Sequence, residues 1–218
     1  MRKLKLKSYE YIENLSKNEN PQKLAARLNS EKLGLGGISL SKAEAQILQF
    51  LVMTTKAKKV VEIGTLTGLS ALYILENLQD DGCLWTLEKS PEHAALAAEV
   101  LHDYVRKNRC KILLGDAKEK LKEISQEGPF DAIFIDGNKA AYLDYFHWAT
   151  QNVNIGGIIV ADNIFLAGAV WGDQSVQKFN DKQVKVVNEM NQLAFLDKNL
   201  KSMIVPTEEG LLVCKKLS

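Results

Sequence analysis

From residue 59 onward, short apolar runs alternate with segments of helical character. Five of these runs are rich in Val, Ile, Leu and Phe, which is typical of buried strands. The helix after the second run opens at Ser90-Pro91-Glu92, where serine can cap the helix and proline suits its first position. Strands that alternate with helices predict a parallel sheet with helices on both faces. The predicted strands are 60–64, 83–87, 111–114, 130–135 and 157–161, and the other predicted helices are 68–78, 117–125 and 142–152.

The two ends of the chain depart from this alternation. Residues 8–33 form a mostly polar segment of helical character, which stops at a glycine-rich stretch. Ser41 and Glu44 then have the spacing of a capping box, so a further helix begins there. Near the C-terminus, residues 201–205 and 211–215 flank a turn that contains Pro and Gly, which predicts a hairpin.

These elements predict a single α/β domain. The fold expected is a doubly wound, mostly parallel seven-stranded sheet with one antiparallel C-terminal strand. Residues 1–35 would form a helical N-terminal extension, and residues 36–218 would form the core. At 218 residues, the chain is long enough to bury a core without disulfides or structural metals.

Composition excludes several classes of protein. The 28 basic and 27 acidic side chains leave a formal charge of +1, so we expect neither nucleic acid nor an anionic membrane as a partner. Three widely spaced cysteines lack CxxC pairing, which indicates reduced thiols. No apolar run approaches the ~20 residues of a membrane span. The basic residues 1–7 precede no apolar core, so we expect no signal peptide and a soluble, cytoplasmic protein.

Ligands of open α/β sheets bind at the carboxyl ends of the strands, and polar residues are concentrated there. Gly64 and Gly68 are four positions apart, which is not the dinucleotide-binding spacing, and Glu62 precedes them. An acid at this position would repel a pyrophosphate but suit a ligand with an ammonium or sulfonium group. A plain strand-to-helix turn is the alternative. The polar residues at the predicted strand ends are Glu62, Gly64, Glu88, Asp116, Asp136, Asp162 and Asn163.

Glu88 ends the second predicted strand. An acid about 20 residues after a glycine turn commonly binds the two hydroxyls of a ribose. The alternative is a solvated charge paired with Lys89. Together with the first turn, Glu88 favours a ligand of the adenosine type.

The fourth and fifth predicted strands each end in a carboxylate. Asp136, Asp162 and Asn163 offer oxygen donors that suit a hard cation such as Mg²⁺. Helix capping by Asp162 and Asn163 is the alternative. Lys139 lies three residues after Asp136, and a lysine near a cation and partly shielded from water can accept a proton near neutral pH. An exposed loop lysine is the alternative there.

Three segments resemble known families. Residues 61–70, Val-Glu-Ile-Gly-Thr-Leu-Thr-Gly-Leu-Ser, resemble motif I of the class I S-adenosylmethionine-dependent methyltransferases. Residues 130–142 and 156–163 resemble the cation-dependent O-methyltransferases, a family that includes caffeoyl-CoA and catechol O-methyltransferases. The resemblance runs from about Gly36 to Lys216 and implies the Rossmann-like class I methyltransferase fold.

The resemblance also implies roles for particular residues. A divalent cation, Mg²⁺ with Ca²⁺ or Mn²⁺ as alternatives, would lie on Asp136, Asp162 and Asn163, and Lys139 would be the general base. The family forms homodimers, so we expect one here. The residues that would contact or lie near S-adenosylmethionine are Ile38, Leu40, Glu62, Gly64, Ser70, Glu88, Asp116, Ala117 and Asp136.

Some positions depart from the family pattern. Gly137-Asn138 stands where many members have a small residue followed by aspartate, and Ile38 stands where methionine is common. Leu166 replaces a frequent tryptophan in a loop that borders the acceptor, and residues 171–187 follow no pattern that can be assigned. The natural acceptor therefore stays open.

The hypothesis is methyl transfer from S-adenosylmethionine to one hydroxyl of a vicinal aromatic diol, of the catechol or caffeoyl type. Metal-bound oxygens and a lysine base would supply the acidity and orientation that this reaction needs. A metal-independent methyltransferase that acts on another small molecule or on RNA is one alternative. A non-catalytic protein that binds an adenosyl ligand is the other.

Overall fold

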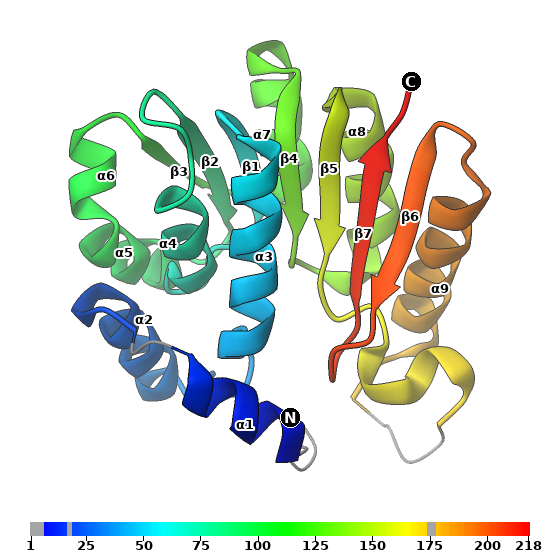
Figure 1. Cartoon of the computed structure of the whole chain (residues 1–218), viewed down its shortest axis with the longest axis horizontal. Helices are drawn as coiled ribbons and strands as arrows, with labels where there is room; N and C mark the ends of the chain where they lie inside the picture. Colours follow the sequence, from blue (N-terminus) through cyan, green and yellow to red (C-terminus); the bar gives the residue numbers. More distant parts are fainter. Residues whose placement is uncertain (1–6, 17–18, 174–177) are drawn as a thin grey trace.

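The computed structural model describes residues 7–16, 19–173 and 178–218. Within them, seven strands form one sheet in the order β3-β2-β1-β4-β5-β7-β6 (Figure 1). β7 runs antiparallel to both of its neighbours, and the β1 to β5 pairs are all parallel, which confirms the predicted fold. The strands are β1 (Lys59–Ile63), β2 (Cys83–Glu88), β3 (Cys110–Leu114), β4 (Phe130–Ile135), β5 (Val153–Ala161), β6 (Leu200–Val205) and β7 (Leu211–Lys216).

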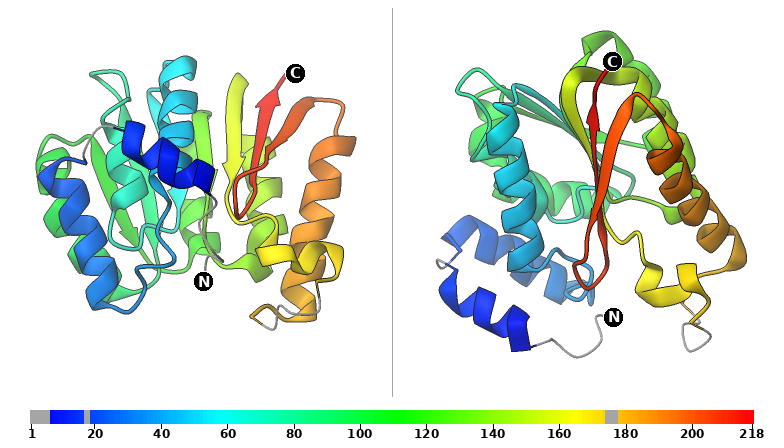
Figure 2. Two further views of the ribbon diagram at one scale, coloured as in Figure 1. Left: turned by 60° about the horizontal axis from the view of Figure 1, so that its bottom comes forward. Right: turned by 45° about the vertical axis from the view of Figure 1, so that its right-hand side comes forward.

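Helices cover both faces of the sheet, as the right-hand view of Figure 2 shows. Side chains alternate along the strands, so Val60 packs with α3, α4 and α5, whereas Val61 packs with α7 and α8. Two buried apolar layers result, one on each side of the sheet. The helices are α1 (Lys7–Leu15), α2 (Pro21–Lys32), α3 (Lys42–Thr55), α4 (Leu69–Leu75), α5 (Pro91–Val100), α6 (His102–Arg106), α7 (Ala117–Ile124), α8 (Tyr142–Asn152) and α9 (Asp181–Leu196), with the short 3-10 helices η1 (Ser125–Glu127), η2 (Lys139–Ala141) and η3 (Leu166–Trp171).

The predicted helix starts are confirmed by their caps. Ser41 and Glu44 form the reciprocal capping box of α3, and Ser90 caps α5 with Pro91 in its first turn. The single helical segment predicted over residues 8–33 is wrong in one respect, since α1 ends at Leu15 and α2 begins anew at Pro21. Asn20 caps α2 by accepting a hydrogen bond from the Lys23 amide. The stretch 1–6, which bears on the signal-peptide prediction, lies outside the described residues.

One long helix was not predicted. α9 begins within residues 171–187, the segment to which no pattern was assigned, and continues beyond it to Leu196, whereas residues 174–177 of that segment lie outside the described part. Asn180 and Gln183 form a capping box at its start, so a local signal was present. The side chains of Val187, Met190 and Ala194 share one buried face of α9, which covers the β6–β7 side of the sheet.

The N-terminal helix α2 is attached to α4 by a buried polar cluster. Arg27 donates two hydrogen bonds to Glu19, at 2.6 and 2.7 Å, and the Tyr73 hydroxyl donates a third at 2.8 Å. Burial opposes ionisation of Glu19, but its hydrogen bonds to Arg27 and Tyr73 hold the pKa of this carboxyl below its usual range. None of the helices in the described residues has the length and apolar character needed to cross a membrane.

Candidate functional site

Two adjoining cavities open at the edge where the parallel strands end. In Figure 1 this is the lower edge of the sheet, beside α1, α2 and η3. The first cavity holds about 270 Å³ and the second about 150 Å³. Ile38, Asp136 and Gly137 line both, so they lie at the boundary between the two spaces. Two ligands can therefore meet at Asp136.

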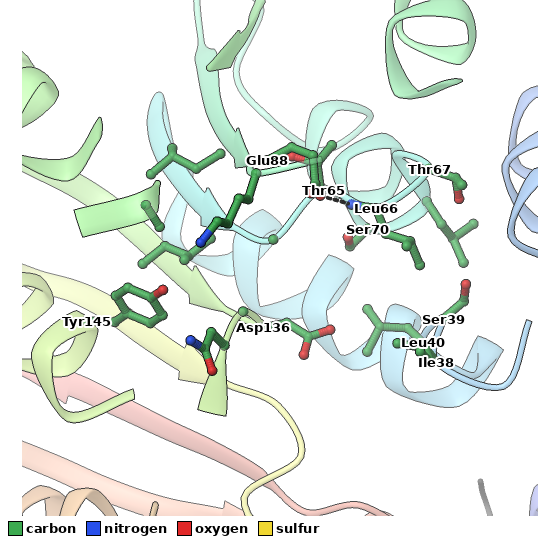
Figure 3. Close-up of a pocket in the computed structure, with 18 of the residues that line it drawn as sticks. Ile38, Ser39, Leu40, Thr65, Leu66, Thr67, Ser70, Glu88, Asp136 and Tyr145 are labelled. Carbon is green, nitrogen blue, oxygen red and sulfur yellow. Dashed lines mark hydrogen bonds between the residues drawn. The ribbon is translucent and has the colours of Figure 1, made fainter. Parts of the chain in front are cut away.

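The first cavity brings together residues from β1, β2, the loop after β4 and the segment before α3. Figure 3 shows Glu88 and Ser70 on the upper side of this space and Asp136, Ile38 and Leu40 on its lower side. All of the predicted cofactor residues except Glu62 line this cavity, namely Ile38, Leu40, Gly64, Ser70, Glu88, Asp116, Ala117 and Asp136. Sequence reasoning missed Tyr145, whose ring joins the wall from α8.

Glu88 is held in a fixed orientation. Its two carboxylate oxygens accept hydrogen bonds from the backbone amides of Leu66 and Ser90, each at 2.8 Å. The alternative of a solvated pair with Lys89 is wrong, because Glu88 is only 9% exposed and the Lys89 ammonium instead lies 3.5 Å from Asp116. An oriented carboxylate that still has free lone pairs can accept hydrogen bonds from a diol.

The turn after β1 requires glycine at position 64. Gly64 has φ +101°, and a Cβ atom added there would lie 2.2 Å from the Asp136 carbonyl oxygen. The Asp136 amide donates to the Ile63 carbonyl at 2.9 Å, which explains how closely the ends of β1 and β4 approach each other. This close approach brings Asp136 to the floor shared by the two cavities.

Glu62 lies below the cavity rather than in its wall. Its side chain is fully buried, and it is missing from the described residues that line either cavity. The Thr86 hydroxyl donates to Glu62 Oε2 at 2.5 Å. Burial raises the pKa of Glu62 to about 8, although the hydroxyls of Ser70 and Thr86 act in the opposite direction. The predicted contact of Glu62 with the cofactor stays a prediction.

The second cavity contains a lysine with defined partners. Lys139 donates to Asp136 Oδ1 at 2.9 Å and makes a short hydrogen bond to the Tyr142 hydroxyl. Tyr142 in turn donates to the backbone carbonyl of Asp162 at 3.0 Å. The Lys139 side chain is 12% exposed, so the alternative of an exposed loop lysine is wrong. Lys139 is therefore held at a fixed point beside Asp136.

Asp162 is fully buried, and neither of its carboxylate oxygens has a hydrogen-bond partner among the described residues. Burial raises the pKa of Asp162 well above its usual range, and the neighbouring charge of Asp136 raises it further. Asn163 follows with φ 56°, a left-handed conformation that asparagine tolerates, and it lines the second cavity. Capping alone does not explain an unpartnered buried carboxylate.

Asp136, Asp162 and Asn163 together offer two carboxylates and an amide. Within the described part of the chain, no group of three or more His, Cys, Asp or Glu side chains is arranged to hold a metal ion. The unpaired oxygens of Asp162 nevertheless fit a hard cation, because such a cation would satisfy oxygens that are otherwise buried without a partner. The donor set is therefore compatible with a cation that keeps other ligands from water or substrate.

The remaining wall of the second cavity was not predicted. Lys178, Phe179 and Glu209 line it, the first two from the segment without an assigned pattern and the third from the β6–β7 turn. The Lys178 ammonium lies 5.5 Å from the centre of the Phe179 ring. Leu166, expected to border the acceptor, is fully buried and is missing from the described residues that line either cavity.

Comparison with known proteins agrees with this geometry. The family model described as O-methyltransferase matches residues 14–217. The chain is 36% identical over 169 residues to a catechol O-methyltransferase of Niastella koreensis, which covers 77% of this chain and 76% of that protein. It is 30% identical over 163 residues to a catechol O-methyltransferase of Mycobacterium tuberculosis, which covers 75% of this chain and 74% of that protein.

A solved structure shares the fold over almost the full length. The O-methyltransferase from Bacillus cereus in complex with SAH has a TM-score of 0.86 and 25% identity, and the match covers 96% of this chain and 97% of that chain. The resemblance predicted from residues 61–70 and 156–163 is thereby confirmed at the level of the family. The chain belongs to the O-methyltransferase family.

Proposed function

We propose that this O-methyltransferase moves a methyl group from S-adenosylmethionine to one hydroxyl of a vicinal aromatic diol, with a divalent cation on Asp136, Asp162 and Asn163. The observation that carries the proposal is the pair of adjoining cavities that share Asp136. The cofactor would occupy the first cavity and the diol the second. Mg²⁺ is the cation favoured by these oxygen donors, with Ca²⁺ or Mn²⁺ as alternatives.

The first cavity supports S-adenosylmethionine as the methyl donor. The oriented carboxylate of Glu88 suits the two ribose hydroxyls, and Gly64 and Ser70 lie where the chain turns from β1 into α4. The Bacillus cereus relative was solved with SAH. SAH is S-adenosylhomocysteine, which is this cofactor without the transferred methyl group. When bound, S-adenosylmethionine supplies a methyl group on a positively charged sulfur, and Asp136 places a negative charge nearby.

The donor set supports a cation in the second cavity. Neither carboxylate oxygen of Asp162 has a hydrogen-bond partner in the described structure, and burial together with the nearby charge of Asp136 raises the pKa of this carboxyl, so a bound positive ion would stabilise its ionised form. When bound, the cation supplies Lewis acidity toward the diol oxygens and fixes their orientation. The names of the Niastella koreensis and Mycobacterium tuberculosis relatives, catechol O-methyltransferase, support a diol acceptor.

Lys139 is the residue we assign to proton removal. Asp136 and Tyr142 hold its ammonium nitrogen in the second cavity, beside the boundary with the first. Burial keeps the pKa of Tyr142 well above its usual range, so this phenol stays neutral and orients Lys139 rather than competing for the proton. Ile38 lines both cavities and so lies at the same boundary. Holding the two reactants in line supplies up to ~7–11 kcal/mol of the rate enhancement.

The test is methyl transfer from labelled S-adenosylmethionine to a panel of small catechols, with EDTA and then with Mg²⁺ restored. We expect activity to vanish with the chelator and to return with the cation. Asp162→Asn should lower transfer by more than about 100-fold, since even an outer partner of a metal ligand contributes 10–100-fold. The matched control is Asp103→Asn, which changes an aspartate that is 56% exposed on α6 and should have no effect.

Two outcomes would contradict the proposal in different ways. Activity that resists the chelator would remove the cation from the mechanism and favour a metal-independent methyltransferase. Cofactor binding without transfer to any diol would move the acceptor to another class of molecule, such as RNA or a different small molecule. If that binding supports no transfer at all, the chain would be a non-catalytic adenosyl-ligand-binding protein.

A further inference from the structure

The wall of the first cavity is built from two segments that α2 touches from behind. We call residues 37–40 the strap and residues 65–68 the motif loop. Ser39 and Leu40 of the strap and Thr67 of the motif loop all line the cavity. In Figure 3 the hydroxyls of Ser39 and Thr67 point toward one another across its right-hand side. They belong to parts of the chain that are far apart in sequence.

Ser30 of α2 joins these two segments. Its side chain is fully buried, and its hydroxyl lies 3.0 Å from the Ser39 hydroxyl and 3.1 Å from the Thr67 hydroxyl. Thr67 is 1% exposed, so the link is sealed from water on that side. A hydroxyl that contacts both walls of a cavity from behind can set the distance between them.

The proton positions of this link follow from counting donors. The Thr67 hydroxyl donates its proton to the Ala26 carbonyl at 2.8 Å, so it must accept in its contact with Ser30. Ser30 therefore donates to Thr67 and accepts from Ser39. The result is a chain with one direction, from the strap through α2 to the motif loop and back to the α2 backbone. Successive hydrogen bonds of this kind strengthen one another, so removal of the middle hydroxyl, that of Ser30, weakens the bonds on both sides of it.

A second contact ties the strap to the same helix. Arg27 Nη1 donates to the Leu40 carbonyl at 2.9 Å, while its other nitrogens hold Glu19. The strap is therefore attached to α2 at two successive residues. Both Ser30 and Arg27 lie outside the set of residues that line the cavity, so their effect on a ligand passes through Ser39, Leu40 and Thr67.

We propose that Ser30 is a positioning residue for cofactor binding, because its hydroxyl fixes the strap against the motif loop at the separation that S-adenosylmethionine requires. This proposal rests on the proposed function, which assigns that cofactor to the first cavity. It makes α2 part of the binding apparatus although the helix itself contributes no wall residue among the described residues of the first cavity. Ser30 acts on the affinity for the cofactor and not on the methyl-transfer step, since its hydrogen bonds do not connect it to Lys139.

The experiment measures binding of S-adenosylhomocysteine by calorimetry and the KM for S-adenosylmethionine in transfer assays. Ser30→Ala deletes only the hydroxyl group and with it the link. We expect Kd and KM to rise about five-fold, the equivalent of one neutral hydrogen bond, with kcat within about two-fold of wild type. Ser39→Ala should weaken binding in the same way. Adding Ser39→Ala to Ser30→Ala should then cause little further loss, because both break the same chain.

The matched control is Ser202→Ala. The Ser202 hydroxyl on β6 also donates to a buried helix carbonyl, that of Ala194, but it lies at the far edge of the sheet. We expect its Kd to equal that of wild type. If Ser30→Ala does not fold, Ser39→Ala alone still tests the link, because its position in the strap lies outside the core.

The outcomes separate this inference from the proposed function. Wild-type protein that fails to bind S-adenosylhomocysteine would overturn the assignment of the cavity and the inference with it. Wild-type binding together with unchanged Kd in Ser30→Ala would overturn the role of Ser30 alone. Losses of binding free energy that add fully in the Ser30→Ala, Ser39→Ala double variant would also overturn the role of Ser30, since the two substitutions would then act independently.

Discussion

At the residue scale, the hydrogen bonds of Lys139 separate two possible roles. As a proton acceptor it must lose its proton, whereas as an electrostatic partner of Asp136 it needs only its charge. Lys139→Ala should lower kcat by about 10²–10⁴-fold, the usual contribution of a general base, with the KM for S-adenosylmethionine within two-fold. Lys139→Arg keeps the charge but cannot act as a base, so it should be as slow as the alanine variant.

Steady-state kinetics with saturating catechol give both parameters. The control is Lys118→Ala, which removes an exposed lysine paired with Asp144 on the surface and should leave kcat unchanged. An arginine variant with nearly normal kcat would reject proton removal by Lys139 and leave it a role in charge balance.

Glu62 predicts how stability depends on pH. Burial raises its pKa from 4.5 to about 8 in the folded protein, so the folded state binds this proton more tightly than the unfolded state does. Its contribution to stability is therefore complete below pH 4.5 and is lost as the pH rises to about 8. Across that window the free energy of unfolding should fall by roughly 1 kcal/mol per pH unit because of this one group.

Urea titrations of wild type and Glu62→Gln at pH 5, 6.5 and 8, in the presence of EDTA, isolate that contribution. The difference between the two proteins should grow in favour of Glu62→Gln as the pH rises, because the amide has no charge to bury. Parallel pH profiles would mean that Glu62 ionises in the folded state as easily as in water.

At the scale of elements, the turn between β1 and α4 depends on a close backbone contact. Gly64→Ala would place a Cβ atom 2.2 Å from the Asp136 carbonyl oxygen and would also force alanine to φ +101°. We expect a loss of at least about 2 kcal/mol in the free energy of unfolding, from backbone strain together with the clash. Gly156→Ala is the control, since it has φ +80° but no atom within 4 Å of the added Cβ.

Denaturant unfolding of the two variants separates strain from clash. Both variants carry the cost of a left-handed backbone. The additional loss of unfolding free energy in Gly64→Ala therefore measures the clash where the ends of β1 and β4 approach each other. Equal losses would show that the turn has room to relax and that the floor of the cavities is less rigid than its geometry indicates.

Elements were predictable from the sequence where the signal is local. Ser41 with Glu44 and Ser90 with Pro91 mark helix starts within four residues, and the carboxyl end of each parallel strand follows from its apolar run. Gly64, Glu88 and Asp136 lie at or just after those ends and line the first cavity, whereas Ile38 and Leu40, in the segment before α3, were expected only from the family resemblance.

What could not be predicted depends on packing between distant segments. Glu62 lies near a strand end like the others, but the fold buries it fully beside Thr86 of β2, and the alternation of side chains does not encode that depth. Tyr145 and Glu209 reach the cavities from a helix face and a hairpin turn. Only the assembled sheet, with β7 inserted between β5 and β6, brings these positions to one edge.

At the scale of the whole molecule, the cavities draw on nearly every part of the chain. The strap comes from the N-terminal part, the motif loop and Glu88 from the first strands, and Glu209 from the C-terminal hairpin. Truncation that removes the strap or the C-terminal hairpin would therefore remove lining residues, although Lys139, the proposed base, lies in the middle of the chain. The cofactor and the acceptor would bind where these segments converge. Loss of one wall should therefore weaken the binding of both ligands.

The surface of the N-terminal helices supports the expected homodimer. α1 and α3 contact each other, and the side chains of Tyr11, Leu15 and Phe50 on them are 66%, 69% and 61% exposed. Large apolar side chains exposed on contacting helices are typical of an interaction surface. With a formal charge of only +1, the chain has little net repulsion to oppose self-association.

We predict that light scattering at micromolar concentration gives twice the chain mass of 24.3 kDa. Replacing Tyr11 and Leu15 together by glutamate should shift the mass toward that of one chain, because charges in an apolar contact lose their hydration. Ile155→Glu is the control, since Ile155 is 72% exposed on β5, in a different part of the chain. A wild-type mass of one chain would exclude the homodimer, and a dimer insensitive to the double variant would place the interface elsewhere.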